Sequence, residues 1–252
     1  MTVYAPLDHA RRVADVQDML PLGNGCDALL FTDLDDVRLL PGFTGSIGWA
    51  VLTGADLVLG TDGRYGDRAR AETASSGATV IAETSRARLH ERLIGSLRRA
   101  ARVGFDPTST THAEWQRLAA DVALEPTDSV VVRQRLIKDA AEIERMSAAA
   151  AAADAALAEV EPILFAASDT AVTEADVRNE LEYRMRLHGA DDRSYETIVA
   201  SGPEHAARPH HEATHRAIGD GDTVIIDVGA LVDGYHSCLL YTSDAADDVS
   251  TV

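Results

Sequence analysis

The sequence predicts an α/β domain in its first half, followed by a second region of α+β type. Short apolar runs rich in β-branched residues alternate with segments of helical periodicity as far as about Arg135, a pattern typical of a sheet covered by helices. Beyond that point two long helical patterns come first and a strand hairpin follows. We therefore expect one domain over residues 1–135 and a second over residues 138–237.

The first region opens with a helix and continues as short strands. Residues 8–20 have helical spacing because Val13, Val16 and Leu20 share one face, and Pro21 follows directly. Strands are expected at 28–31, 49–52, 57–59, 79–82 and 103–105, and helices at 87–99 and after the capping box at 111–114.

A long helix opens the second region. Asp139 occupies its N-cap position, with Glu142 at the reciprocal position of a capping box. Pro162 is expected to end or kink it. Apolar residues at three- and four-residue steps predict one continuous packing stripe, made of Ile143, Met146, Ala150, Ala153, Leu157 and Val160.

A second helix and then a strand lead to the hairpin. The helix is expected to begin at Thr173, to turn Val177, Leu181 and Met185 inward, and to stop at Gly189. A strand at 195–200 and a loop at 201–211 follow.

The apolar run 224–228 contains the most informative residue of the chain. The run has the β-branched pattern of a buried strand, yet its fourth residue is Asp227. Burying a carboxylate is costly unless the group is paired or bound to a metal. Asp227 is therefore a candidate metal ligand, and a strand aspartate that caps a nearby turn is the alternative.

The dipeptide Asp233-Gly234 fixes how this strand folds back. Both central positions of a type I′ turn need positive φ, which this dipeptide favours. With that turn Gly229 faces residue 238, so Asp227 and residue 238 lie diagonally on one face of the hairpin. Two carboxylates placed this way would converge on metal ions, but residue 238 is Cys238.

Composition excludes several classes of protein. The formal net charge is −18 over 252 residues and no basic stripe occurs, so a nucleic-acid surface is excluded. Cys26 and Cys238 are too few for a disulfide framework, which favours a reducing compartment. No signal-peptide pattern or run of transmembrane length is present, so we expect a cytoplasmic protein without a membrane partner.

Residues from about 8 to 237 resemble the creatinase, prolidase and aminopeptidase P group of pita-bread metallopeptidases. The C-terminal set of motifs follows the order and spacing of that family. The matching strings are Pro41–Ser46, Thr61–Tyr65, Tyr195–Pro203, Pro209–His211, Ile226–Gly229 and Asp233–Ser237. The resemblance implies a creatinase/prolidase-type α/β N-terminal domain, followed by an incomplete α+β pita-bread catalytic domain.

The resemblance also implies a chemistry. Members hydrolyse the peptide bond before proline with two divalent metals, held by two aspartates, a histidine and two glutamates. Asp227 matches the first metal aspartate, and His210 matches a catalytic histidine that contacts the substrate and is not a ligand. The second aspartate belongs at Cys238, and the remaining ligands lie beyond the end of this chain. Mn²⁺ suits such a site best, with Co²⁺ or Zn²⁺ acceptable. The full-length parent would be a homodimer acting on proline-containing peptides.

The family pattern stops after Ser237. Residues 238–252 begin Cys-Leu-Leu-Tyr-Thr-Ser, which we interpret as read-through into a sequencing-library adapter at the end of a truncated gene fragment. We therefore expect this fragment to be inactive, because one aspartate cannot hold a metal pair and a thiolate is a soft ligand.

Three other functions were weighed. A non-catalytic, peptide-binding pita-bread relative is the main alternative, and a genuine cysteine at position 238 would favour it. A metal-free creatine-hydrolysing enzyme is disfavoured by the retained Asp227. The string His211-Glu-Ala-Thr-His215 fits a zinc-protease motif but needs a helix for which little room remains, and we expect His211 to be a solvated loop residue.

Overall fold

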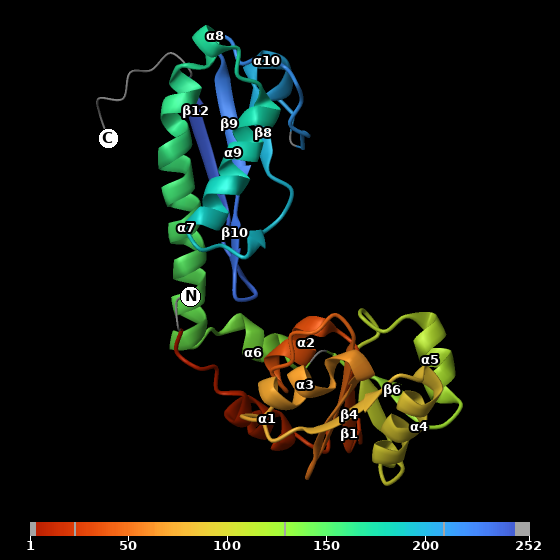
Figure 1. Ribbon diagram of the computed structural model, residues 1–252. Coiled ribbons are helices and arrows are strands. Elements are labelled where there is room, and N and C mark those ends of the chain that lie inside the picture. Colours follow the sequence, from red (N-terminus) through yellow and green to blue (C-terminus); the bar gives the residue numbers. More distant parts are fainter. Residues whose placement is uncertain (1–3, 23, 129, 209, 245–252) are drawn as a thin grey trace. The chain divides into compact units, whose positions relative to one another are not determined.

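The computed structural model describes residues 4–22, 24–128, 130–208 and 210–244. These residues form two compact units, one of Leu7–Lys138 and one that joins the segment before Leu7 to the chain from Asp139 onward (Figure 1). None of the helices within the described ranges is both long and apolar enough to cross a membrane.

The first unit is built on a six-stranded sheet. Strand β2 runs antiparallel to both of its neighbours and the other pairs are parallel, so β1, β3, β4, β5 and β6 all point the same way. Their carboxyl ends therefore share one edge of the sheet. In spatial order the strands are β4 (Thr79–Glu83), β3 (Leu57–Asp62), β2 (Gly48–Thr53), β1 (Ala28–Phe31), β5 (Val103–Phe105) and β6 (Leu124–Pro126).

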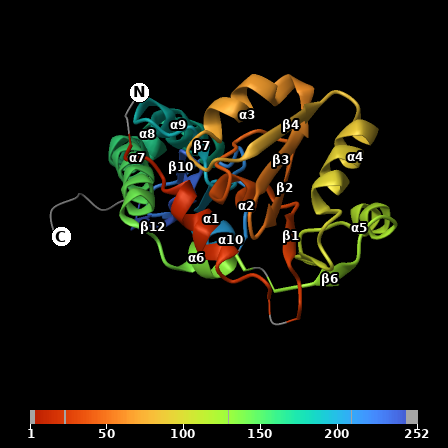
Figure 2. The same cartoon turned by 90° about the horizontal axis from the view of Figure 1, so that it is seen from below.

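Helices cover both faces of this sheet. Alternate residues of β1 belong to opposite cores, because successive side chains of a strand point to opposite faces. Leu29 and Phe31 pack in the core beneath α1, α2 and α3, whereas Leu30 packs in the core with α4 and α5 (Figure 2). The helical segments are α1 (His9–Gln17), α2 (Leu34–Leu39), η1 (Gly63–Tyr65), α3 (Gly66–Glu72), α4 (Arg86–Leu97), α5 (His112–Ala119) and α6 (Val132–Leu136).

The predicted elements of this unit are all present. The capping box at Thr111 and Glu114 is formed, with both reciprocal hydrogen bonds. The apolar residues Trp115, Leu118 and Val122 predict that this helix reaches Val122, but it ends at Ala119 and is therefore shorter than the pattern indicates.

The second unit packs two helices against two small sheets. One sheet has the order β12-β9-β8 and the other β11-β10-β7. Figure 1 shows the long helix α7 beside α9, along the strands. The elements are α7 (Ala140–Phe165), α8 (Ala167–Thr170), α9 (Glu174–Leu187), β7 (Asp192–Arg193), β8 (Ile198–Ser201), α10 (Gly202–His205), β9 (Thr223–Val228), β10 (Ala230–Val232), β11 (Tyr235–His236) and β12 (Leu239–Asp244).

The inner face of α7 differs from the predicted stripe. Ile143 is 53 % exposed and Ala150 is exposed, whereas Ala149 is fully buried. The prediction holds further along, where Ala153 and Val160 are buried. An alanine run offers no contrast between faces, so its periodicity cannot fix the rotation of the helix. The helix also continues past Pro162, and ends at Phe165.

Two further predictions for this unit need correction, because the strand expected at 195–200 is β8 (Ile198–Ser201) and the loop expected at 201–211 contains the short helix α10 (Gly202–His205). The remaining predictions agree with the structure. The capping box of α7 is formed, and Val177, Leu181 and Met185 of α9 are buried in the core. Asp233 and Gly234 have φ values of 44° and 77°, as a type I′ turn requires.

The hairpin register is also as predicted. Val232 pairs with Tyr235 on one side of the turn, and further along Val228 pairs with Leu239. Gly229 lies at the crossing between the two sheets, where a Cβ atom would stand 2.1 Å from the Ser237 carbonyl oxygen. Only glycine fits there, and the close approach holds residue 238 opposite it.

Candidate functional site

Asp227 and Cys238 converge on one hydroxyl group. The Tyr195 hydroxyl donates to Asp227 Oδ1 at 2.6 Å and lies 3.2 Å from Cys238 Sγ. Because Leu240 is the direct partner of Asp227, Cys238 occupies the diagonal position on the same face of the β9–β12 pair. The predicted juxtaposition of positions 227 and 238 is therefore present.

Tyr195 stays protonated at this site. Burial of the phenol and its hydrogen bonds to Asp227 and Cys238 all raise the pKa of Tyr195 above its ordinary value. The hydroxyl is therefore a hydrogen-bond donor at neutral pH, and a carboxylate at Asp227 is its natural acceptor.

The base of the hairpin is fixed by a set of serine hydrogen bonds. Ser194 Oγ lies 2.9 and 2.8 Å from the carbonyl oxygens of Ala230 and Ser237, either of which can accept its one hydrogen. The Ser237 hydroxyl is 3.1 Å from the Ala149 carbonyl oxygen of α7. An open hollow of about 540 Å³ lies beside this base, lined by Met146, Ala150, Tyr195, His236, Ser237 and Cys238.

These side chains do not complete the metal pair that the family motifs imply. Asp227 offers a hard carboxylate ligand in the expected place, and its neighbour across the hairpin is a soft thiol. Two carboxylates at positions 227 and 238 would offer hard oxygen ligands to a pair of cations, whereas one carboxylate with one thiol does not provide that ligand set.

Within the part of the chain that the structure describes, His210 forms no hydrogen bond or ion pair with the hairpin residues. Its side chain is exposed on the loop between α10 and β9, and among the described residues it has no hydrogen-bond or ion-pair partner. Pro209, the preceding residue of the motif, lies outside the described residues.

Glu174 is the residue that sequence reasoning missed. Its side chain is fully buried at the first turn of α9, and six groups from the segment before β9 surround its two oxygens. Oε1 accepts from Ser201 N (2.8 Å), Ser201 Oγ (2.8 Å) and His205 Nδ1 (2.8 Å). Oε2 accepts from His211 Nε2 (3.0 Å), Thr214 N (3.0 Å) and Thr214 Oγ1 (2.7 Å).

This cluster keeps Glu174 ionised. Burial alone would raise the pKa of the carboxyl group, but hydrogen bonds from His211, His205, Thr214 and Ser201 lower the pKa of Glu174 far below its ordinary value. The charge is therefore present at neutral pH and its lone pairs are taken up by protein donors.

The same cluster corrects the prediction for His211. Its side chain is 6 % exposed and bonded to Glu174, so it is not a solvated loop residue. Residues 211–215 are not helical, which rules out the zinc-protease arrangement of His211 and His215. Ligand atoms of Glu174, His205 and His211 do lie within 4.8 Å of one another, a spacing that a metal ion accepts. The six hydrogen bonds to the carboxylate indicate instead that Glu174 anchors the segment before β9.

The backbone reinforces this anchor. Glu174 N donates to the Arg216 carbonyl oxygen at 3.1 Å, and Ile218 N donates to Val172 at 2.9 Å. Arg216 in turn binds Asp222 at 2.7 Å and closes the loop before β9 begins. The segment that carries His210 is thus tied at several points to the start of α9.

The N-terminal motif strings have a structural role. Tyr65 packs edge-on against Phe43 and is hydrogen-bonded to Ser46 at 2.8 Å. A Cβ atom at Gly45 would meet the Phe43 ring at 2.1 Å, which explains a glycine there. Arg64 is 75 % exposed and pairs with Asp62.

Two family models match the chain in order. The Creatinase/Prolidase N-terminal domain matches residues 17–137, and Metallopeptidase family M24 matches residues 144–248. An uncharacterised peptidase of Bacillus subtilis is 34 % identical over 226 residues, which is 86 % of this chain and 61 % of that protein. An Xaa-Pro dipeptidase of Pyrococcus furiosus is 37 % identical over 116 residues, covering 46 % of this chain and 32 % of its own length.

Solved structures agree with these matches. An Xaa-Pro dipeptidase from Bacillus anthracis superposes with a TM-score of 0.82 at 28 % identity, over 93 % of this chain and 63 % of its own. An X-Pro aminopeptidase from Thermotoga maritima gives 0.77 at 26 % identity, over 87 % of this chain and 63 % of its own. The chain thus spans just over three fifths of the length of these relatives. With both domains matched in sequence and in fold, it belongs to the creatinase, prolidase and aminopeptidase P family of metallopeptidases.

Proposed function

We propose that the chain is part of an Xaa-Pro peptidase of aminopeptidase P or prolidase type, acting on proline-containing peptides. The observation that carries the proposal is the position of Asp227, which is half-buried on β9 and diagonal to residue 238 across the hairpin. Two proteins to which the chain is similar are named Xaa-Pro dipeptidases, which supports the substrate class.

The parent protein would hold two divalent metal ions, with Mn²⁺ favoured by the oxygen-rich ligand set of the family. When bound, such a pair supplies an activated water and polarises the scissile carbonyl. Asp227 is the residue of this chain that would contribute a ligand, and His210 would contact the substrate. We also propose that the parent is a homodimer in the cytoplasm.

The test needs the source gene read through codon 238. We expect an aspartate at that codon, with a histidine and two glutamates further on. The protein so encoded should release proline from an Xaa-Pro dipeptide or the first residue from an Xaa-Pro peptide, and Asp227→Asn should abolish that activity. A full-length protein that binds Mn²⁺ and cleaves neither substrate would overturn the proposal.

For the 252-residue chain we propose no peptidase activity, even with Mn²⁺ supplied. Cys238 replaces a hard ligand with a soft one at the centre of the site. Purified chain should leave an Xaa-Pro peptide intact, and any release of product beyond that of an Asp227→Asn control would contradict this.

A non-catalytic peptide-binding relative is the second candidate, and Cys238 is the observation that favours it. The two candidates differ at one codon. If the genomic sequence runs without interruption through Cys238 to the end of the chain, the adapter interpretation of residues 238–252 is wrong and the binding function gains support.

A further inference from the structure

The first unit has a slot between α4 and α5 that no helix covers. Helix α4 packs on β2, β3 and β4, whereas α5 packs against β6. Leu30 of β1 and Trp49 of β2 line the slot on the sheet side. This slot is remote in sequence from Asp227 and belongs wholly to the unit Leu7–Lys138.

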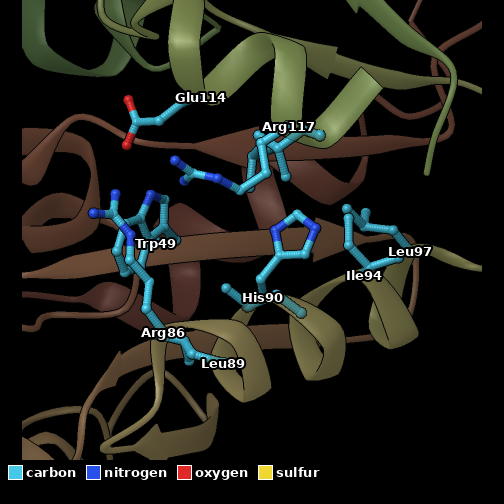
Figure 3. A pocket seen from close by; sticks show the side chains of 11 residues that line it. Trp49, Arg86, Leu89, His90, Ile94, Leu97, Glu114 and Arg117 are labelled. Carbon is cyan, nitrogen blue, oxygen red and sulfur yellow. The ribbon is translucent and has the colours of Figure 1, made fainter. Parts of the chain in front are cut away.

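The slot has apolar walls and widens at one end. Its inner part, about 40 Å³, is lined by leucine and isoleucine side chains of α4 and α5 (Figure 3). Its outer part is a cavity of about 370 Å³ that shares Trp49, Arg86, Leu89 and Glu114 with the inner part. That volume is at the lower end of the ~300–1,000 Å³ of small-molecule sites.

The outer cavity lies at the edge of the sheet where ligands of α/β domains bind. Its lining includes Thr32, Asp62 and Thr84, which stand at or just after the carboxyl ends of β1, β3 and β4. Open sheets with helices on both faces place their ligand sites outside these strand ends.

The charged side chains around the slot indicate which kind of ligand it can bind. Arg86 of α4 and Arg117 of α5 both extend toward Trp49 (Figure 3), and neither has an ion-pair partner among the described residues. The lining carboxylates Asp62 and Glu83 are already paired, with Arg64 at 2.8 Å and with Arg92 at 2.8 Å.

The carboxylate of Glu114 reduces the net positive charge at the mouth of the slot. It accepts hydrogen bonds from Thr111 N and Oγ1 as part of a capping box and counts as one formal negative charge. With two unpaired guanidinium groups and one unpaired carboxylate, the mouth of the slot carries one net positive charge. In a chain of net charge −18, this is a local excess of the opposite sign.

We infer that this slot binds a small organic carboxylate with an apolar body. The carboxylate would be held between Arg86 and Arg117, whose planar guanidinium groups suit it. The apolar body would rest on Trp49 and enter between Leu89 and the α5 side of the slot. This site does not depend on the proposed peptidase activity.

The experiment uses the full chain and the probe 3-phenylpropionate, with the uncharged 3-phenylpropanamide as its matched neutral form. The two tryptophans are Trp49, which lines the slot, and Trp115, which is 38 % exposed on α5. A Trp115→Phe background leaves Trp49 as the sole reporter. Titration by fluorescence, repeated by calorimetry, then gives the dissociation constant of each probe.

The carboxylate should bind at least tenfold more tightly than the amide. Arg86→Gln and Arg117→Gln should each weaken carboxylate binding about three- to tenfold, and added salt should weaken it further. Arg99→Gln removes the same charge from an exposed residue of the same unit that does not line the slot, and should change nothing.

Three outcomes would overturn the inference. These are equal binding of carboxylate and amide, equal loss with Arg99→Gln, or no binding of either probe. Because Arg86 and Arg117 are exposed and unpaired, their variants should unfold at the same temperature as the parent chain, which separates a binding defect from a folding defect.

Discussion

Replacing the buried carboxylate of Glu174 by an amide should destabilise the second unit selectively. In Glu174→Gln one oxygen remains an acceptor, while the new NH₂ group faces three of the six donors that the carboxylate now accepts. Each charge-assisted hydrogen bond contributes ~1.5–3 kcal/mol, and these bonds are not additive around one group. Breaking one buried, paired charge typically costs ~3–5 kcal/mol, which is the loss of unfolding free energy that we expect.

The chain provides its own internal control for this measurement. Both tryptophans, Trp49 and Trp115, lie in the unit Leu7–Lys138, so fluorescence follows that unit alone. Far-UV circular dichroism includes the 26-residue helix α7 and therefore follows the other unit as well. Glu174→Gln should lower the urea midpoint by circular dichroism and leave the fluorescence midpoint unchanged.

Glu180→Gln is the matched control variant. It makes the same chemical change on the same helix, at a carboxylate that is 34 % exposed and pairs with Arg184. Its cost should stay below ~1 kcal/mol, as for other partly exposed ion pairs. Two results would refute this reasoning. Glu174→Gln could lower the free energy of unfolding no more than Glu180→Gln does, or it could shift the circular dichroism and fluorescence midpoints equally. Either result would mean that the six hydrogen bonds to Glu174 do not stabilise the second unit as inferred.

Three further predictions use other parts of the chain. The pKa of Glu174 is lower in the folded than in the unfolded state. The contribution of Glu174 to the free energy of unfolding should therefore be complete above about pH 4.3 and be lost as the pH falls through the folded pKa. Urea titrations below pH 4 should show a flatter pH dependence of stability for Glu174→Gln than for the parent. Gly229→Ala places a Cβ atom 2.1 Å from a carbonyl oxygen and should destabilise the hairpin by ~2 kcal/mol or more, whereas Gly54→Ala, which meets nothing, should not; equal unfolding midpoints would contradict the register. Limited proteolysis should leave a resistant piece that ends near Arg135, and equal resistance of both units would contradict independent folding.

Local sequence signals were enough to predict the longer helices, most of the strands and the hairpin, but not short elements such as α2, α3, β6, α6 and α10. A type I′ turn needs two residues of particular backbone freedom, and Asp233-Gly234 supplies both in adjacent positions. Once the turn is fixed, pairing follows by counting, so the diagonal relation of Asp227 and Cys238 needed no tertiary information. The capping boxes at Thr111 and Asp139 are equally local, because donor and acceptor lie three residues apart.

The parts that could not be predicted depend on contacts distant in sequence. Tertiary packing decides which face of α7 is buried, because the alanines on all sides of the helix give no hydrophobic contrast between its faces. The donors to Glu174 come from 27 to 40 residues further along the chain, and no periodic pattern connects them. A lone glutamate in the first turn of a helix is ordinarily explained by the helix dipole, and that explanation gives no reason to expect burial.

The two adjacent histidines of the loop show how an anchor of this kind separates roles. His211 is buried because Glu174 accepts its ring N–H, while His210, one residue earlier, remains exposed. In the sequence the two histidines simply follow a proline and are equivalent. Only the hydrogen bond of His211 to the buried carboxylate of Glu174 distinguishes them. Because the anchor fixes the backbone on one side of His210, replacing Glu174 should change the orientation of that imidazole even though the two side chains form no hydrogen bond with each other. The substrate contact proposed for His210 requires an exposed imidazole, and the hydrogen bond of His211 to Glu174 explains why the second histidine cannot take that role.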